Sequence, residues 1–192
     1  LISECDALLY DSLIPQELLE LVSTECELHF VGKKRGHHSV PQNKINACLF
    51  EIAQRYKCVV RLKGGDPFLF GRGAEEAAYL VKQGVRVEVV PGITAGIAVP
   101  AYMGIPVTHR LAGSSVTFVT GHEDIDQRRE RVNWRLLAKA SNGIVIYMGL
   151  HNLQFIVDEL ITGGLDASTP AVVIQQGTVI GQRCIKAAIS QI

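Results

Sequence analysis

Short β-type runs alternate with helical patterns along nearly the whole chain, and this alternation restricts the fold more than any other feature of the sequence. It is typical of an α/β protein whose sheets are largely parallel. The predicted strands are residues 7–10, 28–31, 59–62, 85–90, 116–120, 144–148 and 171–175. The sequence therefore predicts the α/β fold class.

Helical patterns lie between several of these strands. The clearest is residues 44–56, where apolar side chains return every three or four positions and form one stripe that can pack on a sheet. A second helix is predicted at 74–83, and Gly84 is placed to end it in a left-handed conformation. Two more are predicted at 134–140 and 153–160.

The length of 192 residues allows either one large domain or two small ones. Residues 104–115 contain Pro106 and several glycine or alanine residues but no periodic pattern, which is typical of a boundary. We place this boundary near Ala112. The prediction is an N-terminal α/β domain at 1–111 and a C-terminal α/β domain at 112–192.

The charge balance argues against several classes of partner. Lys plus Arg and Asp plus Glu both number 19, so no overall field favours nucleic acid or an anionic membrane. The sequence shows neither a membrane-spanning run nor a signal-peptide pattern, which predicts a cytoplasmic protein without nucleic-acid or membrane partners. The cysteines form no C-x-x-C pair and the histidines have no metal-ligand spacing, so we predict no metal site.

Ligands of open α/β sheets gather beyond the carboxyl ends of the strands. The predicted strand 59–62 is followed by the glycine-rich segment 63–73, which matches neither the phosphate-binding P-loop nor the dinucleotide motif. Asp66 in this segment could accept hydrogen bonds from a ligand hydroxyl or ammonium group, or from the backbone of its own turn. The pattern alone leaves both roles open.

Other strand ends carry polar residues as well. Thr94 follows the predicted strand 85–90 and could cap a helix or contact a ligand. Asp11 and Lys33 follow the first two predicted strands, where a carboxylate and an ammonium group could accept and donate protons. A turn aspartate and a solvated lysine are the ordinary alternatives. No nucleophile motif is present, so covalent catalysis is not expected.

Several segments, in this order, together resemble the tetrapyrrole methylase family, and within it the enzymes that methylate uroporphyrinogen III. They are residues 9–11, 30–33, 59–68, 70–73, 90–95, 104–110, 120–122 and 147–150. The resemblance covers essentially the whole chain. It implies two α/β domains, S-adenosylmethionine bound in the cleft between them, and a homodimer.

The resemblance also implies roles for individual residues. Asp11 matches the family's proposed proton acceptor and Lys33 its proposed proton donor. The implied contacts to S-adenosylmethionine are Gly64, Gly65, Asp66, Leu69, Thr94, Ala95, Met148 and Gly177. The implied reaction is C-methylation of uroporphyrinogen III to precorrin-2, on the route to sirohaem and cobalamin, with S-adenosylhomocysteine as the second product. Cations expected near the substrate carboxylates are Lys33, Lys34, Arg35, Arg72 and Arg110.

The sequence also departs from the family. The family begins with a strand that ends in a Gly-x-Gly-Pro-Gly-Asp turn and finishes with a further helix and strand, which this sequence lacks. We therefore expect an internal fragment of an active enzyme. Ser12 stands where the family often has a larger or basic residue. The alternatives are a methyltransferase acting on a later precorrin, a diphthine-type relative, or a non-catalytic binding or dimerisation module.

Overall fold

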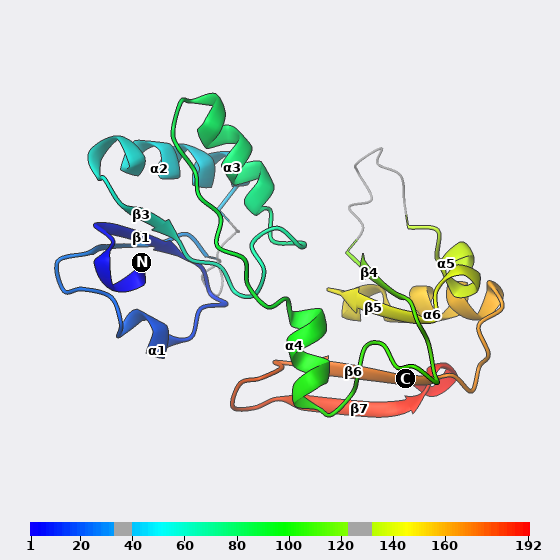
Figure 1. Ribbon diagram of the computed structural model, residues 1–192. Helices are drawn as coiled ribbons and strands as arrows, with labels where there is room; N and C mark the ends of the chain where they lie inside the picture. The colour runs from blue at the N-terminus through cyan, green and yellow to red at the C-terminus, as the bar shows by residue number, and fades with distance from the viewer. Residues whose placement is uncertain (33–39, 123–131) are drawn as a thin grey trace. The chain divides into compact units, whose positions relative to one another are not determined.

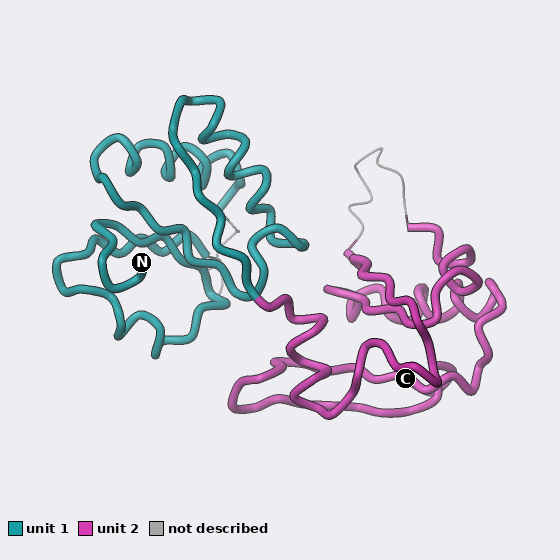
Figure 2. Tube along the Cα trace, viewed as in Figure 1, with its two compact units in different colours: residues 1–92 teal, residues 93–192 magenta. Residues whose placement is uncertain are grey.

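The computed structural model describes residues 1–32, 40–122 and 132–192 (Figure 1). The chain divides into two compact units, Leu1–Gly92 and Ile93–Ile192, which are coloured separately in Figure 2. Among the described residues the first unit has one three-stranded sheet and the second has two two-stranded sheets, and each unit has its own hydrophobic core. Both contain parallel strands with helices, so the predicted α/β class is confirmed.

The first unit is built on a three-stranded parallel sheet in the order β2-β1-β3. Its elements are η1 (Ile2–Glu4), β1 (Ala7–Tyr10), α1 (Gln16–Leu19), β2 (Glu27–Phe30), α2 (Gln42–Arg55), β3 (Val59–Arg61) and α3 (Gly73–Lys82). Helices α2 and α3 lie on one side of the sheet and α1 on the other (Figure 1). Because the three strands are parallel, their carboxyl ends lie along the same edge of the sheet.

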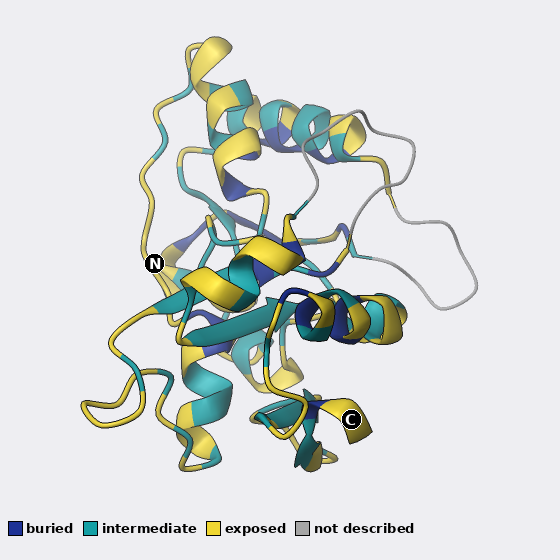
Figure 3. Cartoon of the chain, turned by 90° about the vertical axis from the view of Figure 1, so that its right-hand side faces the viewer, coloured by how far each residue is buried: buried dark blue, intermediate teal, exposed yellow. Residues whose placement is uncertain are grey.

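Helix α2 covers the sheet with the apolar stripe that the sequence predicted. Ile45, Leu49 and Ile52 are buried against Ala7 and Leu9 of β1. Buried segments of the chain are dark blue in Figure 3. Truncating such a buried leucine to alanine costs about 2–5 kcal/mol in the free energy of unfolding.

Helix α3 ends where the sequence predicted. Gly84 has a φ of 79°, a left-handed conformation that glycine adopts without steric cost. The amide of Val85 then donates to the carbonyl of Leu80, which closes the last turn.

The second unit combines a parallel strand pair with an antiparallel one. Its elements are α4 (Ala95–Tyr102), β4 (Val116–Thr120), α5 (Trp134–Ala140), β5 (Gly143–Tyr147), η2 (Leu150–Asn152), α6 (Leu153–Thr162), β6 (Pro170–Gln175), β7 (Arg183–Ala188) and η3 (Ile189–Gln191). Strands β4 and β5 are parallel, whereas β6 and β7 are antiparallel. Trp134, Ile156 and Leu160 form the centre of the core.

The strand predicted at 85–90 is absent, and this prediction was wrong. The segment keeps the alternation that suggested a strand, because Val85 and Val87 are half-buried whereas Arg86 and Glu88 are exposed and paired with each other at 2.5 Å. Its largely exposed course is yellow in Figure 3. A strand also needs a hydrogen-bonded neighbour, and among the described residues β3 pairs with β1 alone.

The two units divide between Gly92 and Ile93, not near Ala112. Residues 93–111 were predicted to belong to the first domain, but α4 packs within the second unit. The amide of Gly96 donates to the hydroxyl of Tyr147 at 2.6 Å, and Val99 lies against Gly177. These contacts involve residues far apart in the sequence, so local breakers such as Pro106 did not reveal them.

Candidate functional site

The carboxyl edge of the first unit places Asp11 at its centre. Its Oδ1 accepts a hydrogen bond from the amide of Leu13 at 3.0 Å, and its Oδ2 accepts one from Nη2 of Arg61 at 3.2 Å. The side chain retains 21% of its exposure. Asp11 is thus both a turn residue and one half of a partly buried ion pair, with its carboxylate still accessible.

Glycines allow the neighbouring turns to approach Asp11 closely. A Cβ added to Gly32 would lie 2.6 Å from the amide nitrogen of Ser12, and one added to Gly64 would lie 3.1 Å from Cβ of Leu13. A Cβ on Gly92 would overlap the carbonyl oxygen of Gly65. The turns after β1, β2 and β3 and the Pro-Gly turn therefore meet at one edge.

Asp66 fixes the glycine-rich turn after β3. Its Oδ1 accepts hydrogen bonds from the amides of Leu69 and Phe68, both at 2.9 Å, and its Oδ2 lies 3.5 Å from the amide of Gly92. The amides of Leu69, Phe68 and Gly92 stabilise the carboxylate and lower the pKa of Asp66. Of the two roles that the pattern left open, the structure shows the bonding to the backbone of the turn.

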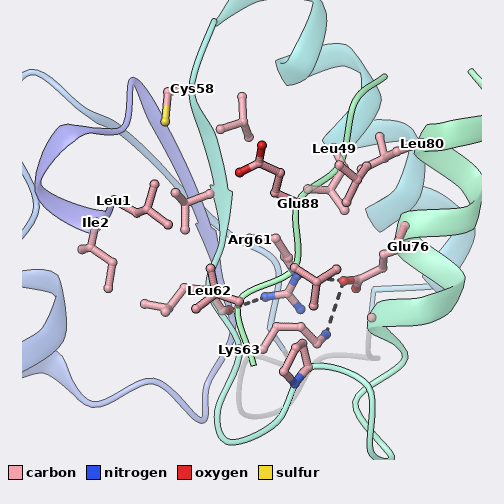
Figure 4. A pocket seen from close by; sticks show the side chains of 18 of the residues that line it. Leu1, Ile2, Leu49, Cys58, Arg61, Leu62, Lys63, Glu76, Leu80 and Glu88 are labelled. Carbon is pink, nitrogen blue, oxygen red and sulfur yellow. Dashed lines mark hydrogen bonds and ion pairs between the residues drawn. The ribbon is translucent and has the colours of Figure 1, made fainter. Parts of the chain in front are cut away.

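A cluster of buried charges lies beside this edge. Glu76 of α3 is 4% exposed and binds Nζ of Lys63 at 3.3 Å and Nε2 of Gln42 at 3.0 Å. Nε of Arg61 lies 3.5 Å from the same carboxylate. Figure 4 shows Arg61, Lys63 and Glu76 pointing toward one another from strand and helix. Burial is the main cause that lowers the pKa of Lys63, and the nearby Arg61 adds to it.

In the second unit a network of hydroxyl groups holds the start of α4. Thr94 is 8% exposed and its Oγ1 lies 2.6 Å from the hydroxyl of Tyr147, which also accepts the amide of Gly96 at 2.6 Å. Thr94 begins the helix as predicted, but its hydroxyl bonds Tyr147 and does not cap the helix amides. The end of β5 and the start of α4 are thus held together.

Two further turns of the second unit have unusual backbone conformations. Met148 follows β5 with a φ of 55° and is 57% exposed. Gln176 and Thr178 have φ values of 52° and 68°, and Gly177 between them lies against Val99 of α4. Left-handed non-glycine residues are uncommon and concentrate at functional sites. The amide of Thr178 donates to Oε1 of Gln182 at 2.8 Å, which fixes the second of these turns.

Residues 1–192 match the profile of the "Tetrapyrrole (Corrin/Porphyrin) Methylases". The chain belongs to this family. A methylase relative, the uroporphyrinogen-III C-methyltransferase of a Synechocystis species, is 51% identical over 178 residues, which are 93% of this chain and 68% of that protein. The siroheme synthase of Thiobacillus denitrificans is 45% identical over 99% of the chain, which spans only 39% of that protein.

A solved structure agrees with the methylase fold. The uroporphyrin-III C-methyl transferase of Thermus thermophilus, crystallised with S-adenyl homocysteine, superimposes with a TM-score of 0.83 at 32% identity. The match covers all of this chain and 80% of that one. The strand and helix order described above is therefore the methylase order.

A cavity with a volume of about 1060 Å³ lies within the first unit of the methylase. It runs along β3 and is bounded by Leu49 of α2, Leu80 of α3 and residues 85–92. Lys63 and Glu76 reach it at one end (Figure 4). Its lining combines apolar side chains with charged ones, among them Arg61, Lys63 and Glu88.

The methylase structure places most of the predicted site residues within two groups. Gly64, Gly65, Asp66 and Leu69 share one turn close to Asp11, and Thr94, Ala95 and Gly177 lie around α4, with Met148 next to Tyr147. Lys33 lies outside the described residues, as do Lys34 and Arg35. Arg61, Glu76 and Tyr147 are site residues to which the sequence predictions gave no role. The sequence did contain one signal for this cluster. Arg61 is a charged residue inside an apolar predicted strand, and a buried charge requires a partner of opposite charge.

Two features are absent from the described ranges. None of the helices in residues 1–32, 40–122 and 132–192 is long and apolar enough to cross a membrane. Within the same ranges no group of three or more His, Cys, Asp or Glu side chains could hold a metal ion.

Proposed function

We propose that this protein transfers methyl groups from S-adenosylmethionine to carbon atoms of uroporphyrinogen III and so forms precorrin-2. The observation that carries the proposal is the 51% identity to a uroporphyrinogen-III C-methyltransferase over 93% of the chain. The turn geometry supports it, because the segments that resemble the family meet at the carboxyl edge of the first unit and around α4 in the second.

The chemistry requires alignment more than reactive protein groups. S-adenosylmethionine, when bound, supplies an electrophilic methyl group, and an electron-rich pyrrole carbon attacks it without help from a protein nucleophile. Holding the two reactants in line can lower the activation barrier by roughly 7–11 kcal/mol. This agrees with a site made mainly of glycine turns and short hydrogen bonds.

Asp11 is suited to remove the proton that leaves the methylated carbon. Its carboxylate is accessible, and Arg61 and the amide of Leu13 fix its direction. A carboxylate held in this way accepts a proton without losing its position. Lys33, the expected proton donor, stays a proposal from the family resemblance.

The residues of the two groups fit S-adenosylmethionine. The donor carries hydroxyl, ammonium, carboxylate and adenine groups, which require hydrogen-bond donors, acceptors and an apolar wall. We propose that Gly64, Gly65, Asp66 and Leu69 of the first unit contact it through their turn, and that Thr94, Ala95, Met148 and Gly177 contact it from the second unit. The left-handed Met148 presents both backbone groups and an exposed apolar side chain.

The direct test is incubation of the full-length protein with uroporphyrinogen III and S-adenosylmethionine. We expect a product with the absorption of precorrin-2 or sirohydrochlorin and with the mass of two added methyl groups. A later precorrin and the diphthine precursor serve as competing substrates. Methylation of one of these in place of uroporphyrinogen III would contradict the substrate assignment, and absence of any methylated product would contradict the function.

We further propose a cytoplasmic homodimer that acts on a tetrapyrrole and on neither nucleic acid nor membrane. All five cysteines are free thiols, which agrees with a reducing compartment. Light scattering of the purified protein should give twice the mass of one chain. A monomer that is active at the same concentration would exclude the dimer as the working form.

A further inference from the structure

We propose that Glu76 is a positioning residue that, through Arg61, holds the Asp11 carboxylate in the direction needed to accept a proton. This inference rests on the proposed function, because it concerns the same site. Glu76 lies on α3, outside the residues to which the family resemblance gave a role. Its carboxylate is nevertheless connected to Asp11 through a single guanidinium group.

The guanidinium of Arg61 makes two hydrogen bonds and one longer ion-pair contact, in which its Nε has no hydrogen-bond partner. Its Nη1 donates to the carbonyl of Leu62 at 2.7 Å, its Nη2 donates to Asp11 at 3.2 Å, and its Nε faces Glu76 at 3.5 Å. A guanidinium is planar and rigid, so the electrostatic attraction of Glu76 on the Nε side influences the direction in which Nη2 points. The charge of Glu76 therefore influences where Arg61 meets Asp11.

Glu76 is itself fixed by partners from two other elements. Gln42 at the start of α2 binds Oε1, and Lys63 after β3 binds Oε2. Helix α3 supplies the backbone, and the side chain keeps only 4% of its exposure. A carboxylate this deeply buried is retained only where charged or polar partners compensate for its lost hydration.

The cluster contains two cations and two carboxylates, so the charges of its four side chains balance. Arg61 and Lys63 are two cations, and Glu76 and Asp11 are the two carboxylates that face them. Burial and the neighbouring Arg61 lower the pKa of Lys63, and Glu76 opposes both effects. Without the charge on Glu76, Arg61 and Lys63 would share Asp11 as their one carboxylate partner in the cluster. Asp11 would then be drawn away from the edge where the substrate is expected.

The test replaces Glu76 by glutamine in the full-length enzyme, which removes the charge and keeps the shape. For Glu76→Gln we expect kcat to fall about tenfold, part of the effect that an aligned general base supplies, while KM for uroporphyrinogen III changes less than about twofold. Glu76→Asp keeps the charge and should restore part of the lost kcat. Glu159→Gln, which alters the exposed ion pair with Arg135, is the matched control and should leave kcat unchanged.

A double-variant cycle separates positioning from a general structural role. If Glu76 acts through Asp11, adding Glu76→Gln to Asp11→Asn should lower kcat no further. Losses that multiply would overturn the proposal, as would a Glu76→Gln enzyme with normal kcat.

A crystal structure of Glu76→Gln gives a readout independent of turnover. We expect the Arg61 guanidinium to turn and its contact with Asp11 to change. An unchanged Arg61–Asp11 contact would refute the inference whether or not the wild-type protein methylates uroporphyrinogen III. A wild-type protein without methylation, together with a displaced Arg61 in the variant, would refute the proposed function and leave the positioning by Glu76 supported.

Discussion

The two units place different chemistry at their functional turns. In the first unit the turns surround ionised groups, with Asp11 bound to Arg61 and Glu76 bound to Lys63. In the second unit Thr94 and Tyr147 are neutral hydroxyl-bearing residues that bind each other and the backbone of α4. The difference agrees with the proposal that the first unit handles the proton and charge, and that neutral groups of the second unit contribute to recognition of the donor molecule.

Replacing Asp11 by asparagine tests the first half of this comparison and should have the largest effect. The amide keeps the contact to Leu13 but cannot accept the proton, so kcat should fall about 100-fold or more. Binding of S-adenosylhomocysteine, measured by calorimetry, should change little. Asp158→Asn on the surface of α6 is the control. Unchanged turnover would remove Asp11 from the mechanism.

Replacing Tyr147 by phenylalanine tests the second half. Oγ1 of Thr94 and the amide of Gly96 then lose a hydrogen-bond partner, and a buried polar group left unpaired costs about 1–3 kcal/mol. Affinity for S-adenosylhomocysteine should fall about tenfold, with a smaller change in the rate of the bound complex. The control is Tyr102→Phe, at a side chain that is 78% exposed. A pure loss of kcat would give the second unit a part in the chemistry.

Gly92→Ala tests whether the contact between the turns matters for stability. The added Cβ would overlap the carbonyl of Gly65, so the backbone must shift, and we expect a loss of about 1–3 kcal/mol in the free energy of unfolding in urea. Gly84→Asn is the comparison, because nothing lies within 4 Å of a Cβ there and asparagine tolerates the left-handed conformation. Equal stabilities of the two variants would argue against a rigid edge.

The smallest expected effect is the pH dependence contributed by Asp66. Its folded-state pKa is depressed below 3.8, chiefly by the amide of Leu69, so its carboxylate stabilises the fold above that pH and the contribution is lost as pH falls through the lower folded value. The Tm difference between wild type and Asp66→Asn should therefore be constant near neutral pH and shrink below pH 3.8. A difference that is independent of pH would mean that the charge of Asp66 contributes nothing.

Local patterns predicted local structure well. The stripe of α2 and the left-handed Gly84 depend on neighbours within one or two helical turns, and both are confirmed. The family resemblance predicted that Asp11 and the glycine-rich turn after β3 belong to the site, and the structure places the turn that contains Asp11 beside the glycine-rich turn. The contacts that these site residues make to S-adenosylmethionine stay predictions.

The features that sequence analysis missed depend on contacts between distant segments. Glu76 and Arg61 are separated by β3's turn and the start of α3, and no spacing rule connects them. Residues 85–90 have strand periodicity, but periodicity does not provide a neighbouring strand. The boundary near Ala112 was placed on local breakers, whereas the contact of Val99 with Gly177 joins α4 to a segment much later in the chain.

The open side of β3 has a consequence for handling the protein. Within the described residues β3 is hydrogen-bonded to β1 alone, so its other side presents backbone amides and carbonyls to any extended polypeptide that reaches it. The protein is thus expected to aggregate through this side of β3 as its concentration rises. The charges of Arg86 and Glu88, which lie near this side of β3, oppose such association only weakly because they neutralise each other.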